Sequence, residues 1–497
     1  MRKTIFGKGI IEFILYFSVR GYLMKRKVAI NYIFTVLNQV VAMIIPLITT
    51  PYISAVLGAE GIGTISYISA ISTYVIIICT YGTSTYACKV IAYNQGKKDI
   101  QSRMFWELFL LRGITLTVGL FLYVIYALTI SNYKLLMLIN SILLLAEMIN
   151  IGWLFDGNED FIFISLRAMA VKIVGVCLVF VFVHEVDDLW KYALILAIST
   201  FGGNIAFWIG LKKYICFAKI QIEALKIHLM GSIKLFIPQL ANSVYLYLDK
   251  VMLGILTETK SENGYYEQTQ KLIRLSLTVI TALSTVMLPR VSNAVKENGE
   301  EKVKEFMNSS LKIVFLLGMP MIAGLCAISD NLVPWFMGQE FMPVINLLCI
   351  CSPIFIFNGI YSIIGTQYFI PLEKEKQYTF TVMLGAFINM GLNILLIPRY
   401  QSIGASIGSM IAEAVVAIVG VFFARRFVSI STIASSIWKY LVGSIIMFFT
   451  IRIVAVRVVP GMIQTLILII IGVITYVSVE CLLKEFLVLG FFTKRKN

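Results

Sequence analysis

The stretch FIFISLRAMAVKIVGVCLVFVFV, residues 161–183, decides the fold class of this chain. A helix needs about 20 apolar residues to cross the hydrocarbon core of a bilayer, and this stretch supplies them. It ends in an acidic turn with Asp187 and Asp188, and the next apolar stretch leads back to Lys212 and Lys213. Acidic residues after one span and basic residues after the next are typical of membrane helices, because positive charge resists translocation.

The rest of the chain repeats this pattern, with about fourteen apolar stretches of spanning length between short polar connectors. Of the 497 residues, 59% are hydrophobic and 14% charged, with a mean hydropathy of +0.87, whereas soluble domains carry roughly 25% charged residues. Lys and Arg gather on alternate connectors, which predicts that both termini are cytoplasmic. The net charge of +15 is therefore mainly a topology signal, which favours anionic lipid headgroups as partners and argues against nucleic acid.

These spans predict an all-α membrane protein of about 14 transmembrane helices, arranged as two pseudo-symmetric six-helix lobes plus a C-terminal helix pair. The expected parts are a cytoplasmic or interfacial extension at 1–23, an N-lobe at 24–226 (spans 1–6), a C-lobe at 227–426 (spans 7–12), and the helix pair with a basic tail at 427–497. Both Met1 and Met24 fit as the start of the chain.

A weak internal sequence similarity supports the prediction of two lobes. The first span ends in Ala55–Gly58 with a break expected at Gly58–Gly63, and the seventh ends in Val251–Gly254 before Gly264. The two segments lie six spans apart, as expected for transporters built from two repeats around a central site.

The sequence offers little for covalent chemistry. The eight cysteines lie mainly in or at the ends of apolar spans, and only two histidines are present, so no metal-ligand constellation can be assembled. No phosphate-binding glycine loop with its Lys, no nucleophile elbow and no soluble segment of domain size are found. We therefore predict a transporter rather than an enzyme, with no catalytic residue, no metal and no cofactor.

Polar residues inside the spans are the remaining candidates for function. A charged side chain near the centre of a membrane helix costs about 2.5 to 3.5 kcal/mol, so it usually faces a bundle interior or a watery cavity. Ser402, Ser406, Ser409 and Glu413 share one helical face. Small-residue helix packing explains the serines equally well, but it does not explain the glutamate.

The seventh and eighth spans carry the most charge. In the seventh, Pro238 predicts a kink below Asp249 and Lys250. In the eighth, Lys271 and Arg274 lie on one face and could hold an anion, although a solvated ion pair with the preceding glutamate explains Lys271 about as well. The predicted substrate cavity contains Lys172, Asn242, Lys250, Lys271 and Arg274, and the candidates for ion coupling are Glu147, Asp249 and Glu413.

Several segments resemble a known family in their order and spacing. They are Leu57–Gly63 after the first span, Trp153–Gly157 after the fourth, Asp249–Gly254 in the seventh, and Asn389–Asn393, Ile397-Pro398, Gly404–Gly408 and Glu413 in the eleventh and twelfth. From about Met24 onward, the chain resembles the Wzx-type polysaccharide flippases of the multidrug/oligosaccharidyl-lipid/polysaccharide exporter superfamily.

The resemblance implies a V-shaped pair of helical lobes around a cavity that opens alternately to the two sides of a bacterial cytoplasmic (inner) membrane. It also implies the cargo, an undecaprenyl-diphosphate-linked oligosaccharide repeat unit flipped for export as O-antigen or capsule. Coupling to H⁺ or Na⁺ is expected, and a polysaccharide polymerase and a chain-length regulator are expected partners.

Three alternatives stay open. A multidrug or cation antiporter of the same superfamily would change drug tolerance, and a lipid II flippase would normally be essential for growth. A membrane polysaccharide polymerase would leave single repeat units exposed outside, but the short outer connectors argue against it.

Overall fold

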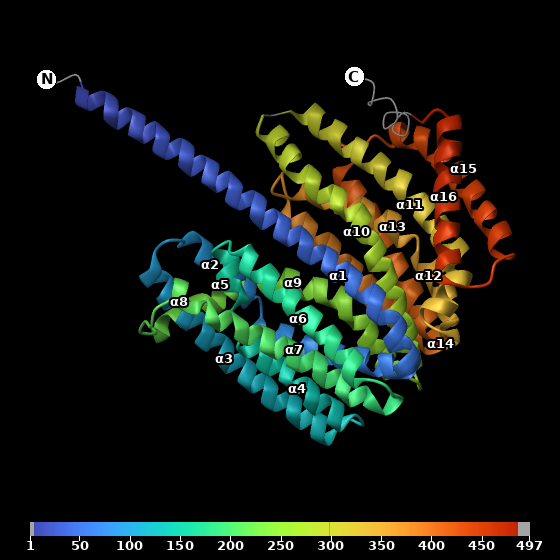
Figure 1. Ribbon diagram of the computed structural model, residues 1–497, viewed down its shortest axis with the longest axis horizontal. Helices are drawn as coiled ribbons and strands as arrows, with labels where there is room; N and C mark the ends of the chain where they lie inside the picture. Colours follow the sequence, from blue (N-terminus) through green and yellow to red (C-terminus); the bar gives the residue numbers. More distant parts are fainter. Residues whose placement is uncertain (1–3, 298, 486–497) are drawn as a thin grey trace. The chain divides into compact units, whose positions relative to one another are not determined.

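The computed structural model describes residues 4–297 and 299–485, and in this part its regular structure is helical without strands (Figure 1). In chain order the elements are α1 (Thr4–Thr80), α2 (Thr83–Tyr93), α3 (Lys98–Thr129), α4 (Lys134–Met148), α5 (Gly152–Gly157), α6 (Phe161–Phe182), η1 (Val186–Asp188), α7 (Leu189–Ile209), α8 (Leu211–Tyr214), α9 (Ile222–Leu256), α10 (Ser261–Lys296), α11 (Glu300–Phe336), η2 (Gln339–Phe341), α12 (Pro343–Cys351), α13 (Ile354–Ile364), the π-helical η3 (Gly365–Phe369), α14 (Glu375–Ala424), α15 (Ile430–Ala455) and α16 (Met462–Leu482). At residues 4–29 and a few positions in α1, α9, α10 and α15, only the backbone is described.

Eleven of the described helical segments are long and apolar enough to cross a membrane. Two of them far exceed one bilayer crossing: the part of α1 from Ile33 to Thr80 has 48 residues, and α14 has 50. Each is interrupted by one residue with non-helical backbone angles, Gly58 and Gln401. If each of these two segments is counted as two spans and the 35-residue α9 is added, the eleven candidate spans become fourteen. The predicted all-α membrane fold is confirmed.

Carboxylates from distant helices stabilise both interruptions. Gly58 has φ of +65°, and the N–H of the next residue donates to Glu340 Oε1 over 3.1 Å. Gln401 has φ of +50°, and the N–H of its next residue donates to Glu262 Oε2 over 3.1 Å. The first N–H groups of a helix lack intrahelical partners and carry partial positive charge, so a carboxylate is favourable there. Glu340 and Glu262 therefore cap the second halves of α1 and α14.

The start of the second half of α1 and the start of α10 are in backbone contact. A Cβ atom added to Gly63 would lie 1.7 Å from the carbonyl oxygen of Lys260, and one added to Gly264 would lie 2.0 Å from that of Ala59. Only glycine permits so close an approach. The segments that follow the two similar span ends thus meet through their glycines.

The chain divides into two compact units. Unit 1 consists of 1–49, 78–184 and 190–236, and unit 2 consists of 50–77, 185–189 and 237–497. Helices α1 and α9 therefore contribute their first parts to unit 1 and most of the remainder to unit 2. The lobe boundaries after residues 226 and 426 stay predictions. In the predicted extension 1–23 only the backbone from Thr4 is described, and most of the basic tail lies outside the described residues.

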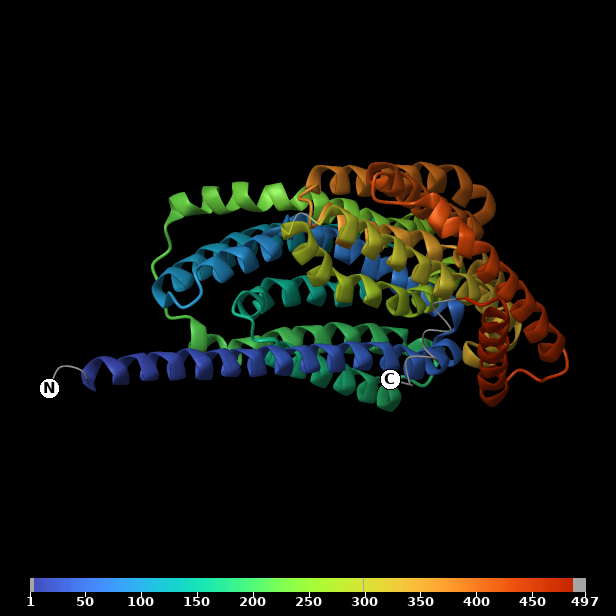
Figure 2. The same ribbon diagram turned by 90° about the horizontal axis from the view of Figure 1, so that it is seen from above.

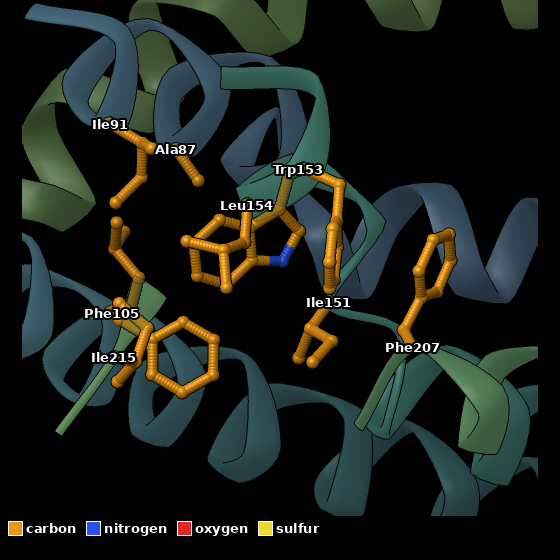
Figure 3. Packing of buried hydrophobic residues seen from close by; sticks show 10 residues of the cluster. Ala87, Ile91, Phe105, Ile151, Trp153, Leu154, Phe207 and Ile215 are labelled. Atoms are coloured by element: carbon orange, nitrogen blue, oxygen red, sulfur yellow. The ribbon is translucent and has the colours of Figure 1, made fainter. Parts of the chain in front are cut away.

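Unit 1 has an aromatic core where α2, α3, α5 and α7 meet (Figure 3). Trp153 and Phe155 of α5 are almost fully buried, and Phe155 stacks on Phe207 of α7 with ring centroids 5.1 Å apart. The core contains Ala87, Ile91, Phe105, Leu108, Ile151, Trp153, Leu154, Phe155, Phe207 and Ile215. The Trp153–Gly157 segment therefore has a structural role in this core.

In unit 2, α11 packs against α15 and α16 at the C-terminal end of the fold (Figures 1 and 2). The Tyr476 hydroxyl of α16 donates to the Leu316 carbonyl of α11 over 2.9 Å. Near the other end of the same helices, Trp335 Nε1 donates to Thr465 Oγ1 over 2.8 Å. The C-terminal helix pair is thus fixed to α11 by hydrogen bonds as well as apolar packing.

Candidate functional site

Asp249 lies at the centre of a buried polar network in unit 2. It belongs to α9, and its exposed fraction is 2%. Its carboxylate accepts hydrogen bonds from Tyr266 of α10, from Ser409 Oγ over 2.6 Å and from Asn393 Nδ2 over 2.5 Å, the last two in α14. Asn393 Nδ2 also donates to Asn389 Oδ1 over 3.2 Å. The network thus joins α9 and α10 to both halves of α14.

The chemistry of this network suits a small cation or a proton. The three side chains that donate to Asp249 are all neutral. Among the described residues, Asn393 Oδ1 is buried and accepts no hydrogen bond. Carboxylate, amide and hydroxyl oxygens are the ligands that hard cations prefer. A buried carboxylate without a cationic partner is also the kind of group that holds a proton.

An ionic cluster lies beside this network in sequence. Lys250 Nζ is 2.5 Å from Glu267 Oε2, which also accepts a hydrogen bond from Ser66 Oγ over 2.8 Å. Lys271 Nζ donates to Thr50 Oγ1 over 3.1 Å, and Glu267 is one helical turn away from it. Among these side chains, two lysines accompany one glutamate, so the cluster of Lys250, Glu267 and Lys271 has a net positive charge. Lys250 and Lys271 thus both lie near Glu267, and their place in a substrate cavity stays a prediction.

Arg274 follows Lys271 on the same face of α10 and is solvent-exposed. It lies well inside a helix that is long and apolar enough to cross a membrane. An exposed guanidinium at such a depth is costly against lipid, and it is tolerated where it faces water or other polar groups. Arg274 thus extends the positive surface of α10 beyond the ionic cluster.

The residues of the Ser402–Glu413 face bind different partners. Ser402 binds Glu262, and Ser409 binds Asp249. Glu413, with an exposed fraction of 6%, accepts a hydrogen bond from Asn358 Nδ2 of α13 over 3.1 Å. Glu413 and Asp249 both stay proposed candidates for ion coupling.

The candidates in unit 1 have their own partners. Glu147 of α4 pairs with Arg112 of α3, whose side chain is almost fully buried, and also accepts from Asn150 Nδ2 over 2.9 Å. Lys172 of α6 donates to Asn38 Oδ1 of α1 over 3.3 Å. The sequence interpretation left out Arg112, although a lone Arg within an apolar span is the same kind of signal as Glu147. The side chain of the last candidate, Asn242, lies outside the described residues.

A second buried pair in unit 1 was also not indicated by the sequence. His228 Nε2 of α9 lies 3.0 Å from Glu107 Oε2 of α3, and His228 Nδ1 lies 3.2 Å from the Tyr86 hydroxyl of α2. His228 and Glu107 have exposed fractions of 5% and 1%. The first part of α9 is thereby fixed to α2 and α3.

Unit 2 also contains an apolar cavity of about 1040 Å³. Its walls come from α10, α11, α13, α15 and α16. Most of its lining is aliphatic or aromatic, and it includes Leu316, Pro320, Met321, Gly324, Ile328, Phe355, Met447, Ile451, Gly472 and Tyr476. No polar pattern marks these positions in the sequence, so the cavity could not be predicted from it.

Comparisons with known proteins agree with this architecture. The model of the family described as polysaccharide biosynthesis protein matches residues 28–295. A protein of Escherichia coli K12 named "Putative O-antigen transporter" is 23% identical over 402 residues, which cover 80% of this chain and 96% of that protein. In Haloferax volcanii, the protein named "Probable low-salt glycan biosynthesis flippase Agl15" is 25% identical over 203 residues, or 41% of this chain and 43% of that protein.

Among solved structures, the inward closed conformation of the lipid II flippase MurJ superposes with a TM-score of 0.76 at 16% identity, covering 91% of this chain and 98% of that chain. Identity at this level establishes the fold alone. The named relatives are transporters and flippases, so the chain is a membrane transporter rather than an enzyme, and its resemblance to the Wzx-type flippases is confirmed. Because the family model matches more than half of its residues, this chain belongs to the polysaccharide biosynthesis protein family.

Proposed function

We propose that this protein flips undecaprenyl-diphosphate-linked oligosaccharide repeat units across the bacterial cytoplasmic membrane, by alternating access, for O-antigen or capsule export. The hydroxyl groups and phosphate charges of such a cargo would lose their water in hydrocarbon, so it cannot cross unaided. A transporter must replace that hydration for the head while leaving the lipid tail in an apolar environment.

The observation that carries the proposal is the positive face of α10. Lys250 pairs with Glu267, Lys271 lies one helical turn from that glutamate and donates to Thr50, and Arg274 is exposed beyond them. Cations at this depth are expected to face a polar route rather than lipid. A diphosphate is the part of the cargo that such a face would attract, because guanidinium and ammonium groups form strong charge-assisted hydrogen bonds with phosphate oxygens.

The apolar cavity is consistent with a cargo that carries a lipid tail. A polyprenyl tail is purely hydrocarbon, and the lining of the 1040 Å³ cavity offers mainly hydrocarbon contacts. Because the cavity belongs to the same unit as the α10 cluster, one unit contains surfaces suited to both chemical halves of a lipid-linked sugar.

The Asp249 network supports coupling to an ion gradient. A carboxylate with neutral donors and one unoccupied amide oxygen can exchange H⁺ or Na⁺. Binding of either ion would change the charge at the junction of α9, α10 and α14, which gives an ion gradient a means of biasing one conformation over another. Glu413 and Glu147 stay proposals for the same role, and the polymerase and chain-length regulator stay proposed partners.

The test is a deletion strain from which lipid-linked oligosaccharide is extracted. We expect the intermediate to accumulate and surface polysaccharide to be lost, and both to be restored by the wild-type gene but not by Arg274→Ala or Lys271→Ala variants that insert normally. Lys302→Ala, an exposed substitution in α11, serves as the control. A deletion without accumulated intermediate would contradict the proposal. Altered drug tolerance alone would favour an antiporter, and arrested growth would favour a lipid II flippase. Single repeat units exposed on the outer face of the membrane would favour a polymerase.

A further inference from the structure

Glu480 is a buried carboxylate at the C-terminal end of the described part of the chain. It lies in the last turn of α16, and its exposed fraction is 0%. Neither of its carboxylate oxygens has a hydrogen-bond partner among the described residues. A buried ionised carboxylate normally has either a cationic partner or several donors, because it loses its hydration on burial.

The neighbouring charges do not compensate Glu480. Lys439 of α15 is the nearby cation, but its Nζ lies 3.1 Å from Oε2 of Glu485, a second buried carboxylate. Glu485 Oε1 also accepts a hydrogen bond from the Tyr440 hydroxyl over 3.0 Å. One ammonium group thus faces two carboxylates, so an ionised Glu480 would leave the cluster with a buried net negative charge.

The surroundings of Glu480 are tightly packed. A Cβ atom added to Gly443 of α15 would lie 2.6 Å from Glu480 Oε1 and 3.0 Å from Cε2 of Tyr476. The carboxyl group therefore lies against the backbone of α15, one helical turn from Tyr476, whose hydroxyl is bound to the Leu316 carbonyl. Among the described residues of α11, α15 and α16, Lys439 is the one cation whose contacts bring it near Glu480.

We propose that Glu480 is a proton-binding site of the C-terminal helix pair and holds a proton at neutral pH. The site is separate from the Asp249 network and does not depend on the proposed cargo. A neutral carboxylic acid removes the buried net charge that two carboxylates and one ammonium group would otherwise create. Lys439 and Glu485 can then form a balanced ion pair beside it.

The site lies next to the apolar cavity. Tyr476 lines that cavity and packs on Gly443 together with Glu480. Loss of the proton would place a negative charge between α15 and α16 beside Glu485, and repulsion would loosen their contact at this end of the cavity. Proton binding at Glu480 therefore controls the packing of α15 on α16 next to Tyr476.

Labelling of the purified full-length protein with dicyclohexylcarbodiimide tests the proposal. This apolar reagent adds to a protonated carboxyl group in a hydrophobic environment and rearranges to a stable N-acylurea, which adds the mass of the whole reagent. At about pH 7 we expect labelling of Glu480 to exceed that of its ion-paired neighbour Glu485 at least tenfold, and to decrease as the pH is raised. Peptide mass spectrometry measures both sites in the same wild-type sample, and Glu480→Gln confirms the assignment.

Two outcomes would overturn the proposal. One is an unlabelled Glu480, or labelling equal to that of Glu485, at every pH. The other is protection of Glu480 by Na⁺ but not by K⁺ at constant pH, which would make the ligand a sodium ion. As a second measurement, the Tm of the wild type in detergent should fall more than that of Glu480→Gln as the pH rises from about 4 toward neutral. The folded protein keeps a proton that the unfolded chain releases above about pH 4.3, and the glutamine side chain cannot ionise. Equal pH dependence in the two proteins would also contradict a proton at this site.

Discussion

Asp249 accepts hydrogen bonds from three neutral side chains, and this arrangement makes a clear prediction for its replacement by asparagine. Asp249→Asn keeps the volume of the side chain but removes the negative charge, so we expect normal insertion and at least about tenfold slower transport, equivalent to about 1.4 kcal/mol. Delivery of lipid-linked oligosaccharide to the outer face in a complemented deletion strain measures the effect. Glu60→Gln, at an exposed carboxylate, is the control. Wild-type transport by Asp249→Asn would exclude the carboxylate from coupling.

Asp160, between α5 and α6, gives a prediction for pH dependence. Burial alone would raise its pKa, but hydrogen bonds from Lys213 and Tyr214 and the charge of Lys213 outweigh burial and lower the pKa. A carboxyl group with a lowered folded-state pKa stabilises the fold above its unfolded pKa of about 3.9, and this contribution is lost as the pH falls through the folded-state pKa.

The Asp160→Asn variant should therefore be less stable than the wild type at pH 7 and equally stable at strongly acidic pH. Because Lys213 is 63% exposed, water screens the pair, and we expect a loss of no more than about 1 kcal/mol. Thermal unfolding in detergent at the two pH values measures it. A difference that persists or grows in acid would show that the aspartate acts through something other than its charge.

Individual charges in apolar spans could be found in the sequence, but their partners could not. Asp249 and Lys250 stand out because a charge inside a membrane helix is costly. The sequence could not show that the neighbour of Asp249 is an asparagine 144 residues away, because that contact depends on how the helices pack. The same cost argument applies to Arg112 and Glu480, and it would have found both had it been applied to every span.

At the level of elements, the contact between the second half of α1 and the start of α10 predicts which glycines are essential. Gly63→Ala would place a methyl group 1.7 Å from a backbone carbonyl oxygen, so the helices must separate, and we expect a loss of about 3 kcal/mol in stability, the upper end of the usual cost of overpacking. Gly391→Ala in α14 is the matched control, since nothing lies within 4 Å of its added Cβ. Yield and Tm in detergent compare the two. Similar values for both variants would contradict the contact.

The apolar cavity predicts a substitution that blocks transport without unfolding the protein. The added Cβ of Gly324→Ala would meet only a methyl carbon of Met447, at 3.5 Å, so the alanine should be tolerated. Gly324→Phe should fill part of the cavity and slow transport about tenfold or more, equivalent to about 1.4 kcal/mol. Export of lipid-linked oligosaccharide and Tm are measured on both variants. Normal export by a folded Gly324→Phe variant would show that the cargo does not need the cavity.

Structural features marked by polar residues or glycines were easier to predict from the sequence than features built from apolar residues alone. The break near Gly58 was predicted from clustered glycines, and the structure confirms it. The apolar cavity gave no such signal, because its lining residues are indistinguishable in sequence from residues that face lipid. Hydropathy reports that a side chain avoids water, but it does not report which apolar surface covers it.

For the whole molecule, the alternation of charge predicts the orientation of every connector. A reporter active only outside the cytoplasm, such as alkaline phosphatase, should be inactive when fused after Lys98 and active when fused after Glu258. Fusions after Lys376 and after Gly338 repeat the test in the later part of the chain. Activity after Lys98 or Lys376 would reverse the predicted orientation of both termini.

The number of spans followed from the sequence, but the composition of the compact units did not. Length and hydropathy are properties of each segment, so fourteen spans could be counted without knowing their contacts. Residues 50–77 belong to unit 2 although residues 237–497 of that unit lie far away in sequence. The Gly63 and Gly264 contacts that join them are visible only in three dimensions.

The glutamate caps have a consequence for biosynthesis. The second half of α1 begins at an N–H that is satisfied by a carboxylate 281 residues further along the chain, so the ribosome makes the helix long before it makes the cap. The corresponding start in α14 finds its cap already synthesised, 140 residues earlier. The early helix therefore enters the membrane with an incomplete first turn, and it reaches its final form only when two-thirds of the protein has been translated.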